Sequence, residues 1–202
     1  MTEKFKIILY CGPDGAGKDY LAGKALEMLS DFLTTAAMVT TRPARDPKVE
    51  TKIPIEESVF DALHSSGELL GAHLNRGHKY AYRRHDLVEA KKQGKVGALL
   101  EVNPAVQAHL VHELKNDPDL QLVGWIGLAG DQEYLAQNIK SRDNSSDDII
   151  QAKLEMAQQI SDAISVNHKK GLLEIFEVGW SNRATMHEEY SARVAELLGI
   201  SR

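Results

Sequence analysis

Residues 5–19 read FKIILYCGPDGAGKD, an apolar run followed by a glycine-rich turn and a lysine. The run from Phe5 to Tyr10 is typical of a central parallel strand that is covered on both faces. Beyond the turn, a helix is expected to open near Gly17, because apolar residues recur every four positions at Leu21, Ala25, Leu29 and Leu33. The order of strand, turn and helix predicts a βα unit at the start of an α/β fold.

The turn itself has the composition of a loop that binds phosphate. Small residues let successive backbone N–H groups turn inward around phosphate oxygens, and the following helix adds the positive end of its dipole. Lys18 adds a full positive charge for the outer phosphates. Because strand, loop, lysine and amphipathic helix occur together, a purely structural turn is disfavoured. The predicted phosphate-binding residues are Gly12, Pro13, Asp14, Gly15, Ala16, Gly17, Lys18 and Asp19.

Asp19 departs from the usual pattern, in which Ser or Thr follows the lysine and its hydroxyl helps to bind magnesium. A carboxylate is also a hard oxygen ligand for Mg²⁺, so Asp19 can bind the ion directly or through water. The alternative is that Asp19 only caps the helix. We favour metal binding, because the rest of the loop is intact.

Composition limits the class of protein. A length of 202 residues fits one domain, and 43% hydrophobic with 26% charged residues is the balance of a folded soluble protein. The net charge of -5 provides no overall basic field for nucleic acid, and no apolar run approaches the roughly 18 residues of a membrane span. Cys11 is the only cysteine, which excludes an internal disulfide and a thiolate zinc site. We expect a cytoplasmic protein that binds neither nucleic acid nor membrane.

Short apolar runs alternate with segments of helical spacing along the chain, which predicts a parallel sheet covered by helices on both faces. Further strands are predicted at 37–40, 96–102, 120–128 and 173–178, and helices at 57–65, 86–93, 104–115, 131–140, 147–169 and 183–198. Residues 41–82 break the alternation with several prolines and glycines and few strong strands. We interpret 41–82 as a lobe inserted into a core formed by 1–40 and 83–202.

Several short motifs follow one another in a recognisable order. Gly12–Lys18 matches Gly-Pro-Ser-Gly-x-Gly-Lys with Asp14 in place of Ser, and Thr40–Arg45 matches Thr-Thr-Arg-Pro-x-Arg. Residues 67–70, 78–81 and 99–101 match three more motifs, and Arg142 is followed eleven positions later by Lys153. Over most of its length the chain thus resembles the guanylate kinase family of nucleoside monophosphate kinases.

The resemblance implies a P-loop kinase fold with a parallel-sheet core, an acceptor-binding lobe at 41–82 and a mobile lid at about 141–148. It implies ATP and Mg²⁺ as donor and metal, and it assigns Arg42, Arg45 and Tyr80 to the phosphate of the acceptor. Lys18, Arg142 and Lys153 are then the catalytic cations. Glu101, at the end of a predicted strand, is a candidate for holding a magnesium-bound water or for pairing with Lys18 or an arginine.

The departures fall where the family reads guanine. Counted without gaps from Gly67 to Tyr80, the acidic base-reading residue falls on Leu74, and a serine and an aspartate of the family fall on Arg83 and Asn103. Leucine cannot accept hydrogen bonds from the N–H groups of guanine. The nearby His73, Asn75 or Asn103 can take the place of the acidic residue, so guanine specificity stays an open question. Arg83 and Asn103 stay candidate acceptor-binding residues.

The Gly-Lys-Asp ending of the loop resembles that of ribose 1,5-bisphosphokinase, which phosphorylates a sugar bisphosphate. The segment from Arg76 to Lys95 has seven Lys or Arg residues against Asp86 and Glu89, which suits such an acceptor or a solvated helix face. The expected substrate is therefore a nucleotide or a phosphorylated sugar, bound by a monomer or homodimer. A non-catalytic module that binds nucleotides or mediates an interaction is the alternative of another class.

Overall fold

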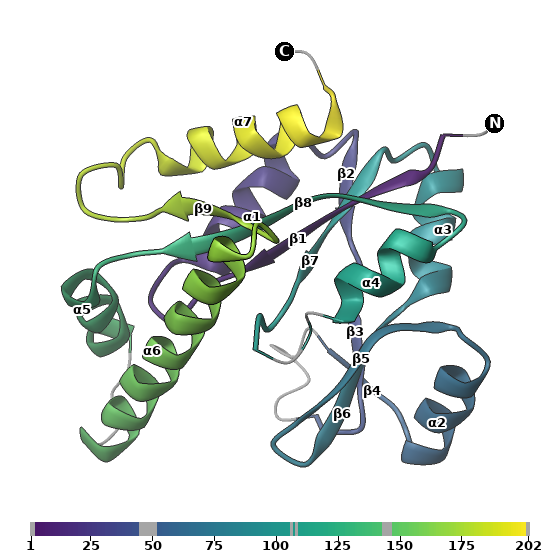
Figure 1. Ribbon diagram of the computed structural model, residues 1–202, viewed down its shortest axis with the longest axis horizontal. Coiled ribbons are helices and arrows are strands. Elements are labelled where there is room, and N and C mark those ends of the chain that lie inside the picture. The colour runs from purple at the N-terminus through teal and green to yellow at the C-terminus, as the bar shows by residue number, and fades with distance from the viewer. Residues whose placement is uncertain (1–2, 45–51, 106, 108, 143–146, 201–202) are drawn as a thin grey trace.

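Two sheets and seven helices form the described part of the computed structural model, which covers residues 3–44, 52–105, 107, 109–142 and 147–200 without the side chain of Arg142. The larger sheet lies in the middle of the molecule, and the smaller one extends from it together with α2 (Figure 1). Among the described residues, no helix combines the length and the apolar composition needed to span a membrane.

The larger sheet has five parallel strands in the order β2, β7, β1, β8, β9. The first strand of the chain lies at its centre, where Ile7 pairs with Ala98 on one side and Leu122 on the other. This confirms the predicted parallel sheet. The strand bounds are β1 Phe5–Cys11, β2 Leu33–Thr35, β7 Gly97–Glu101, β8 Leu120–Ala129 and β9 Glu174–Glu177.

Both faces of β1 are buried, as its continuous apolar sequence predicts. Ile8 belongs to a core cluster with residues of α1 (Lys18–Met28) and α7 (Met186–Leu198). Ile7 and Leu9 point to the opposite side, into a cluster with α3 (Arg84–Lys92), α4 (His109–Asn116) and α6 (Asp147–Lys169). Each of these side chains is fully buried, and burial of one such side chain contributes about 2 kcal/mol. The two helical layers therefore hold the carboxyl end of β1 in a fixed place.

The smaller sheet has four strands in the order β4, β3, β6, β5, and Phe60 of α2 (Glu57–Ser65) packs against it. Its bounds are β3 Met38–Thr40, β4 Ile53–Pro54, β5 Leu69–Asn75 and β6 His78–Arg83. The expectation of few strands in 41–82 is wrong, because β5 and β6 form a long hairpin. Arg76 and Gly77 have φ angles of 49° and 79°, the left-handed pair that a tight two-residue turn requires. Glycine here closes a hairpin instead of interrupting strands.

Three helix boundaries differ from the predicted ones by three residues or more. The first helix does not reach Leu33: Leu29 caps α1 by donating its N–H to the carbonyl of Ala25, and Leu33 begins β2. The predicted helix 104–115 begins at His109, because the side chain of Asn103 accepts the N–H of Ala105 and holds a turn there. The predicted helix 183–198 begins at Met186. Helices α2 and α6 have their predicted bounds, and α5 spans Gln132–Arg142.

An ion-pair cluster joins the end of the hairpin to the core. Arg84, the first residue of α3, donates from Nε and Nη2 to the two carboxylate oxygens of Asp117, at 3.0 Å each. Asp117 also accepts the backbone N–H groups of Asp119 and Leu120, and its side chain is only 7% exposed. Four donors thus converge on one buried carboxylate between α4 and β8.

Burial by itself raises the pKa of the Asp117 carboxyl. The hydrogen bonds from Arg84, Asp119 and Leu120 outweigh burial and hold this pKa below its ordinary value.

Candidate functional site

The glycine-rich loop connects the carboxyl end of β1 to the first turn of α1. Gly15 and Gly17 have φ angles of 86° and 77°, in the left-handed region that favours glycine. A Cβ atom at Gly15 would lie 2.6 Å from the carbonyl oxygen of Leu135, so α5 packs directly against the loop. Asn138 of α5 donates to the carbonyl of Gly15 at 2.9 Å. The glycines are required for this backbone path, as the phosphate-loop interpretation expects.

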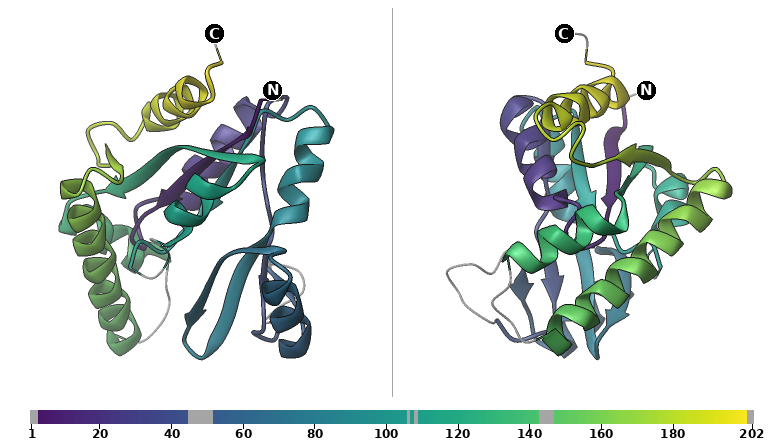
Figure 2. Two further views of the ribbon diagram at one scale, coloured as in Figure 1. Left: turned by 45° about the vertical axis from the view of Figure 1, so that its right-hand side comes forward. Right: turned by 90° about the vertical axis from the view of Figure 1, so that its left-hand side faces the viewer.

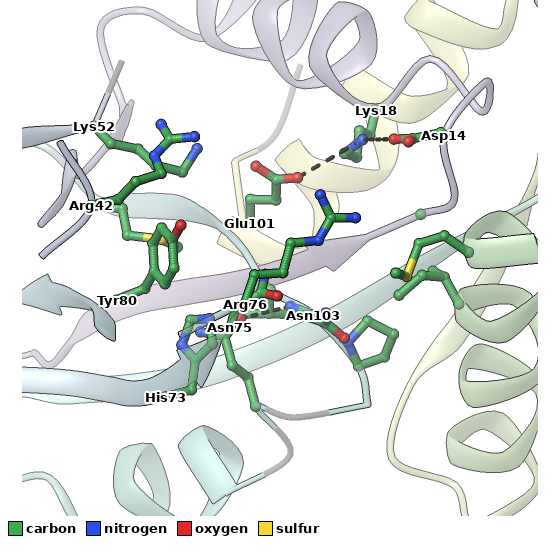
Figure 3. Close-up of a pocket in the computed structure, with 17 residues that line it drawn as sticks. Asp14, Lys18, Arg42, Lys52, His73, Asn75, Arg76, Tyr80, Glu101 and Asn103 are labelled. Carbon is green, nitrogen blue, oxygen red and sulfur yellow. Dashed lines mark hydrogen bonds and ion pairs between the residues drawn. The ribbon is translucent and has the colours of Figure 1, made fainter. Parts of the chain in front are cut away.

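Lys18 lies between two carboxylates (Figure 3). Its Nζ atom is 3.4 Å from Oδ1 of Asp14 and 4.0 Å from Oε1 of Glu101. Glu101 is the last residue of β7, at the edge where the carboxyl ends of the parallel strands meet. Burial raises the pKa of Glu101, with Lys18 opposing this shift and Asp19 adding to it. The loop lysine therefore lies between two acidic side chains.

Two cavities meet at Asp14 and Lys18, which line both of them. The smaller one, of about 200 Å³, is bounded by the glycine loop and α1 on one side and by helices α5 and α6 on the other. The larger one, of about 320 Å³, extends toward the smaller sheet. Figure 2 shows that α6 and the smaller sheet project from the same side of the larger sheet. Ligands in the two cavities would both reach the ammonium group of Lys18.

Three cations line the larger cavity on the side of the smaller sheet: Arg42, Lys52 and Arg76 (Figure 3). Tyr80 of β6 lies beside them. Among the described residues that line this cavity, the only carboxylates are Asp14 and Glu101, both next to Lys18. The end away from Lys18 thus suits an anionic ligand.

The opposite wall is organised by the buried amide of Gln107, which is 1% exposed. Its Oε1 accepts the N–H of Asn103 at 2.6 Å, and its Nε2 donates to the carbonyl of Gly71 at 3.3 Å. Gly71 has a φ of 62°, and its N–H donates to the carboxylate of Glu113 at 2.8 Å. Gln107, just before α4, and Glu113 of α4 therefore fix the backbone of β5, and Gln107 also fixes Asn103, the second residue after β7.

A bulge in β5 decides which side chains face the cavity. The pairing register shifts between Leu70 and His73, which places an extra residue in β5 opposite β6. As a result His73 and Asn75 line the cavity, whereas Leu74 is 64% exposed and does not. Leu74, on which the gap-free count falls, therefore lies outside the cavity.

His73 stacks on Tyr80, with ring centroids 5.6 Å apart and an interplanar angle of 23°. Burial lowers the pKa of His73, which favours the neutral ring. Its Nδ1 lies 3.0 Å from the carbonyl of Gly71; since a carbonyl can only accept, Nδ1 carries the proton. The Nε2 atom of the neutral ring is then a hydrogen-bond acceptor.

The structure brings most of the candidate residues together. Asp19 and Lys153 line the smaller cavity, and Arg42, Tyr80, Glu101 and Asn103 line the larger one. Arg83 is not among the lining residues and donates to Asp86 at 2.9 Å. Arg45 and lid residues 143–146 lie outside the described residues, and Arg142 is described only as part of the α5 backbone.

Sequence reasoning did not assign Lys52 to the site, and it included Arg76 only as the first residue of the basic segment 76–95. Arg76 had a signal, since it occupies the hairpin turn in the sequence Asn-Arg-Gly-His. Lys52 had no local signal, because only the path of the chain brings it to the cavity.

The chain matches no protein-family model and no curated protein. Among solved structures it is similar to the crystal structure of a guanylate kinase from Anaplasma phagocytophilum, with a TM-score of 0.58 and 18% identity. The match covers 98% of this chain and 86% of that one. The fold is therefore a P-loop kinase fold of the kind seen in that guanylate kinase.

Proposed function

We propose that this protein transfers a phosphoryl group from ATP to a small phosphomonoester. The observation that carries the proposal is the placement of Lys18 where a glycine-loop cavity and a cation-lined cavity meet. A phosphoryl group in transfer must contact donor and acceptor at once, and a cation at that point stabilises it from both sides.

The donor phosphates would occupy the smaller cavity. The backbone N–H groups of the loop and the positive end of α1 suit the inner phosphates, and Lys18 and Lys153 suit the transferred group. Arg142 joins them by resemblance to the family. Because phosphoryl transfer needs little covalent help from the protein, positioned cations supply most of the acceleration.

Asp19 and Glu101 have the donor chemistry that Mg²⁺ prefers, and they approach Lys18 from different elements. The described residues contain no cluster of three metal-ligating side chains. This suits Mg²⁺, which is usually held by one or two carboxylates together with water and substrate phosphates. When bound, the ion neutralises charge on the phosphate oxygens.

Asp19→Asn is expected to raise the Mg²⁺ concentration needed for half-maximal activity several-fold, because an amide is a weaker ligand than a carboxylate. Asp31→Asn, which removes an equal charge at the far end of α1, is the matched control. Activity would be titrated with Mg²⁺, and circular dichroism would verify that both variants fold. A titration curve that coincides with that of the unmodified protein would leave Asp19 with a helix-capping role alone.

The acceptor would lie in the larger cavity, with its phosphate toward Arg42 and Tyr80. A nucleoside monophosphate is the leading class. Ribose 1,5-bisphosphate is the second candidate, and the three cations Arg42, Lys52 and Arg76 favour it, because two phosphates need more positive charge than one. The described lining has no carboxylate near His73 and Asn75 that could accept hydrogen bonds from guanine, so the acceptor need not contain guanine.

The proposal is tested by measuring ADP formation from ATP and Mg²⁺ with GMP, dGMP, AMP, UMP, CMP and ribose 1,5-bisphosphate. If one acceptor is turned over and this activity is lost in Lys18→Ala, the protein is a kinase and the acceptor class is identified. Binding of ATP by calorimetry without turnover of any acceptor would instead support a nucleotide-sensing module. Loss of both turnover and binding would overturn the proposal.

A further inference from the structure

Asp14 places a carboxylate inside the phosphate-binding loop itself. Its Oδ1 is 3.4 Å from Nζ of Lys18, one helical turn further along the chain. The Asp14 side chain is 51% exposed and lines both cavities, whereas Lys18 is 19% exposed. The principal cation of the loop is thus paired with a carboxylate at the point where a phosphate would bind.

The surroundings of this pair add further negative charge. Glu101 lies 4.0 Å from Lys18 on the other side, and Asp19 lines the smaller cavity. Burial raises the pKa of Glu101 and Lys18 opposes this shift, while the charges of Asp19 and Asp14 add to it, so the negative charges of all three residues act on the same site. A phosphate chain without a metal ion would therefore meet repulsion from three acids and would have to displace Asp14 from Lys18.

We propose that Asp14 makes binding of the phosphate donor conditional on a divalent cation, by pairing with Lys18 and by repelling phosphate that carries no metal. This inference rests on the proposed function, since it concerns the same donor site. A divalent cation bound to the phosphates cancels most of this repulsion and leaves Lys18 free to turn toward the donor. Asp14 is thus a specificity-determining residue that selects the metal complex of the nucleotide over the free nucleotide.

Asp14→Asn tests this, because the amide keeps the shape of the side chain and removes its charge. Binding of ADP would be measured by isothermal titration calorimetry, once with EDTA and once with excess Mg²⁺. Without metal, the variant is expected to bind ADP about tenfold more tightly than the unmodified protein, the scale of one unit charge close to a phosphate. With Mg²⁺ the two affinities are expected to agree within about twofold, since the ion cancels most of the repulsion.

Asp31→Asn serves as the matched control, because it changes the net charge equally from an exposed position beyond the other end of α1. It is expected to bind ADP like the unmodified protein under both conditions. Asp14→Ser provides a second neutral variant, expected to act in the same direction as Asp14→Asn. Equal affinities of the unmodified protein and both Asp14 variants in EDTA would overturn the inference, as would a gain of equal size with and without Mg²⁺.

A double-mutant cycle with Lys18→Met separates the two effects of Asp14, its ion pair with Lys18 and its repulsion of phosphate. In that background the gain from Asp14→Asn in EDTA is expected to shrink, because Asp14 no longer has a lysine to occupy. An undiminished gain would overturn the pairing part of the inference. If no protein binds ADP even with Mg²⁺, the proposed function itself fails, and that result is distinct from equal affinities in EDTA.

Discussion

Lys18→Ala is expected to lower kcat/KM by about a hundredfold to a thousandfold, the loss typical when one positioned electrostatic donor is removed from a transition state. Asp14 and Lys18 line both cavities, and of these two residues Lys18 carries the positive charge. Its loss therefore weakens contacts with the donor and with the acceptor together. The fold is expected to survive. The Lys18–Asp14 pair is partly exposed, and such pairs contribute at most about 1 kcal/mol to stability.

Steady-state kinetics with the acceptor found in the panel would measure this loss. Lys24→Ala is the matched control, since Lys24 lies on the same helix, six residues further on, where it pairs with Glu27 at the surface. Its kinetics are expected to equal those of the unmodified protein. Turnover by Lys18→Ala within tenfold of normal would refute the role assigned to Lys18.

Asp117→Ala is expected to lower the free energy of unfolding by about 3 kcal/mol, because it removes one partner of a buried ion pair and leaves buried donors unsatisfied. The carboxylate accepts two hydrogen bonds from Arg84 and one each from the N–H groups of Asp119 and Leu120. Urea unfolding would measure the change. Asp61→Ala is the control, since Asp61 is 56% exposed in its pair with Lys79 and is expected to cost less than about 1 kcal/mol.

The effect of Asp117 also has a defined pH dependence. Since the pKa of Asp117 is lower in the folded than in the unfolded chain, its carboxylate stabilises the fold above its unfolded pKa of about 3.9. That stabilisation is lost as the pH falls through the lower, folded pKa. The difference in stability between the unmodified protein and Asp117→Ala should therefore be largest near neutral pH and shrink below pH about 4. A difference that stays constant down to pH about 2 would contradict the assigned ionisation.

The sequence predicted those parts of the fold in which one pattern of apolar residues, either a continuous run or a helical spacing, extends over a long stretch. The buried strand β1, the glycine loop and helices α2 and α6 were all identified, because continuous apolar runs and helical stripes are local properties. The end of α1 was missed, since Leu29 and Leu33 continue the helical spacing by coincidence after the helix has been capped. The β5–β6 hairpin was missed because its glycines resemble breaks in a strand.

For the candidate site, the loop residues and the cavity residues Arg42, Tyr80 and Asn103 were predictable, whereas the way in which the wall is assembled was not. The loop is a single segment whose residues contact one ligand, whereas the wall joins β5, β6 and the segment before α4. His73 and Asn75 face the cavity because of a bulge at Gly71. Gly71 is held by Gln107 and Glu113, which lie 36 and 42 positions further along the chain. A contact of this kind leaves no periodic pattern in the sequence.

The buried amide of Gln107 has a consequence for how such a protein can change over evolutionary time. One side chain sets the position of β5 and of Asn103, whereas the phosphate-binding groups belong to the loop between β1 and α1. Substitution at 107 would thus reshape the space offered to the acceptor while the phosphate-handling groups stay in place. The preference for an acceptor can therefore change over evolution through substitutions such as those at Gln107. The capacity for phosphoryl transfer can change separately, through substitutions in the glycine-rich loop.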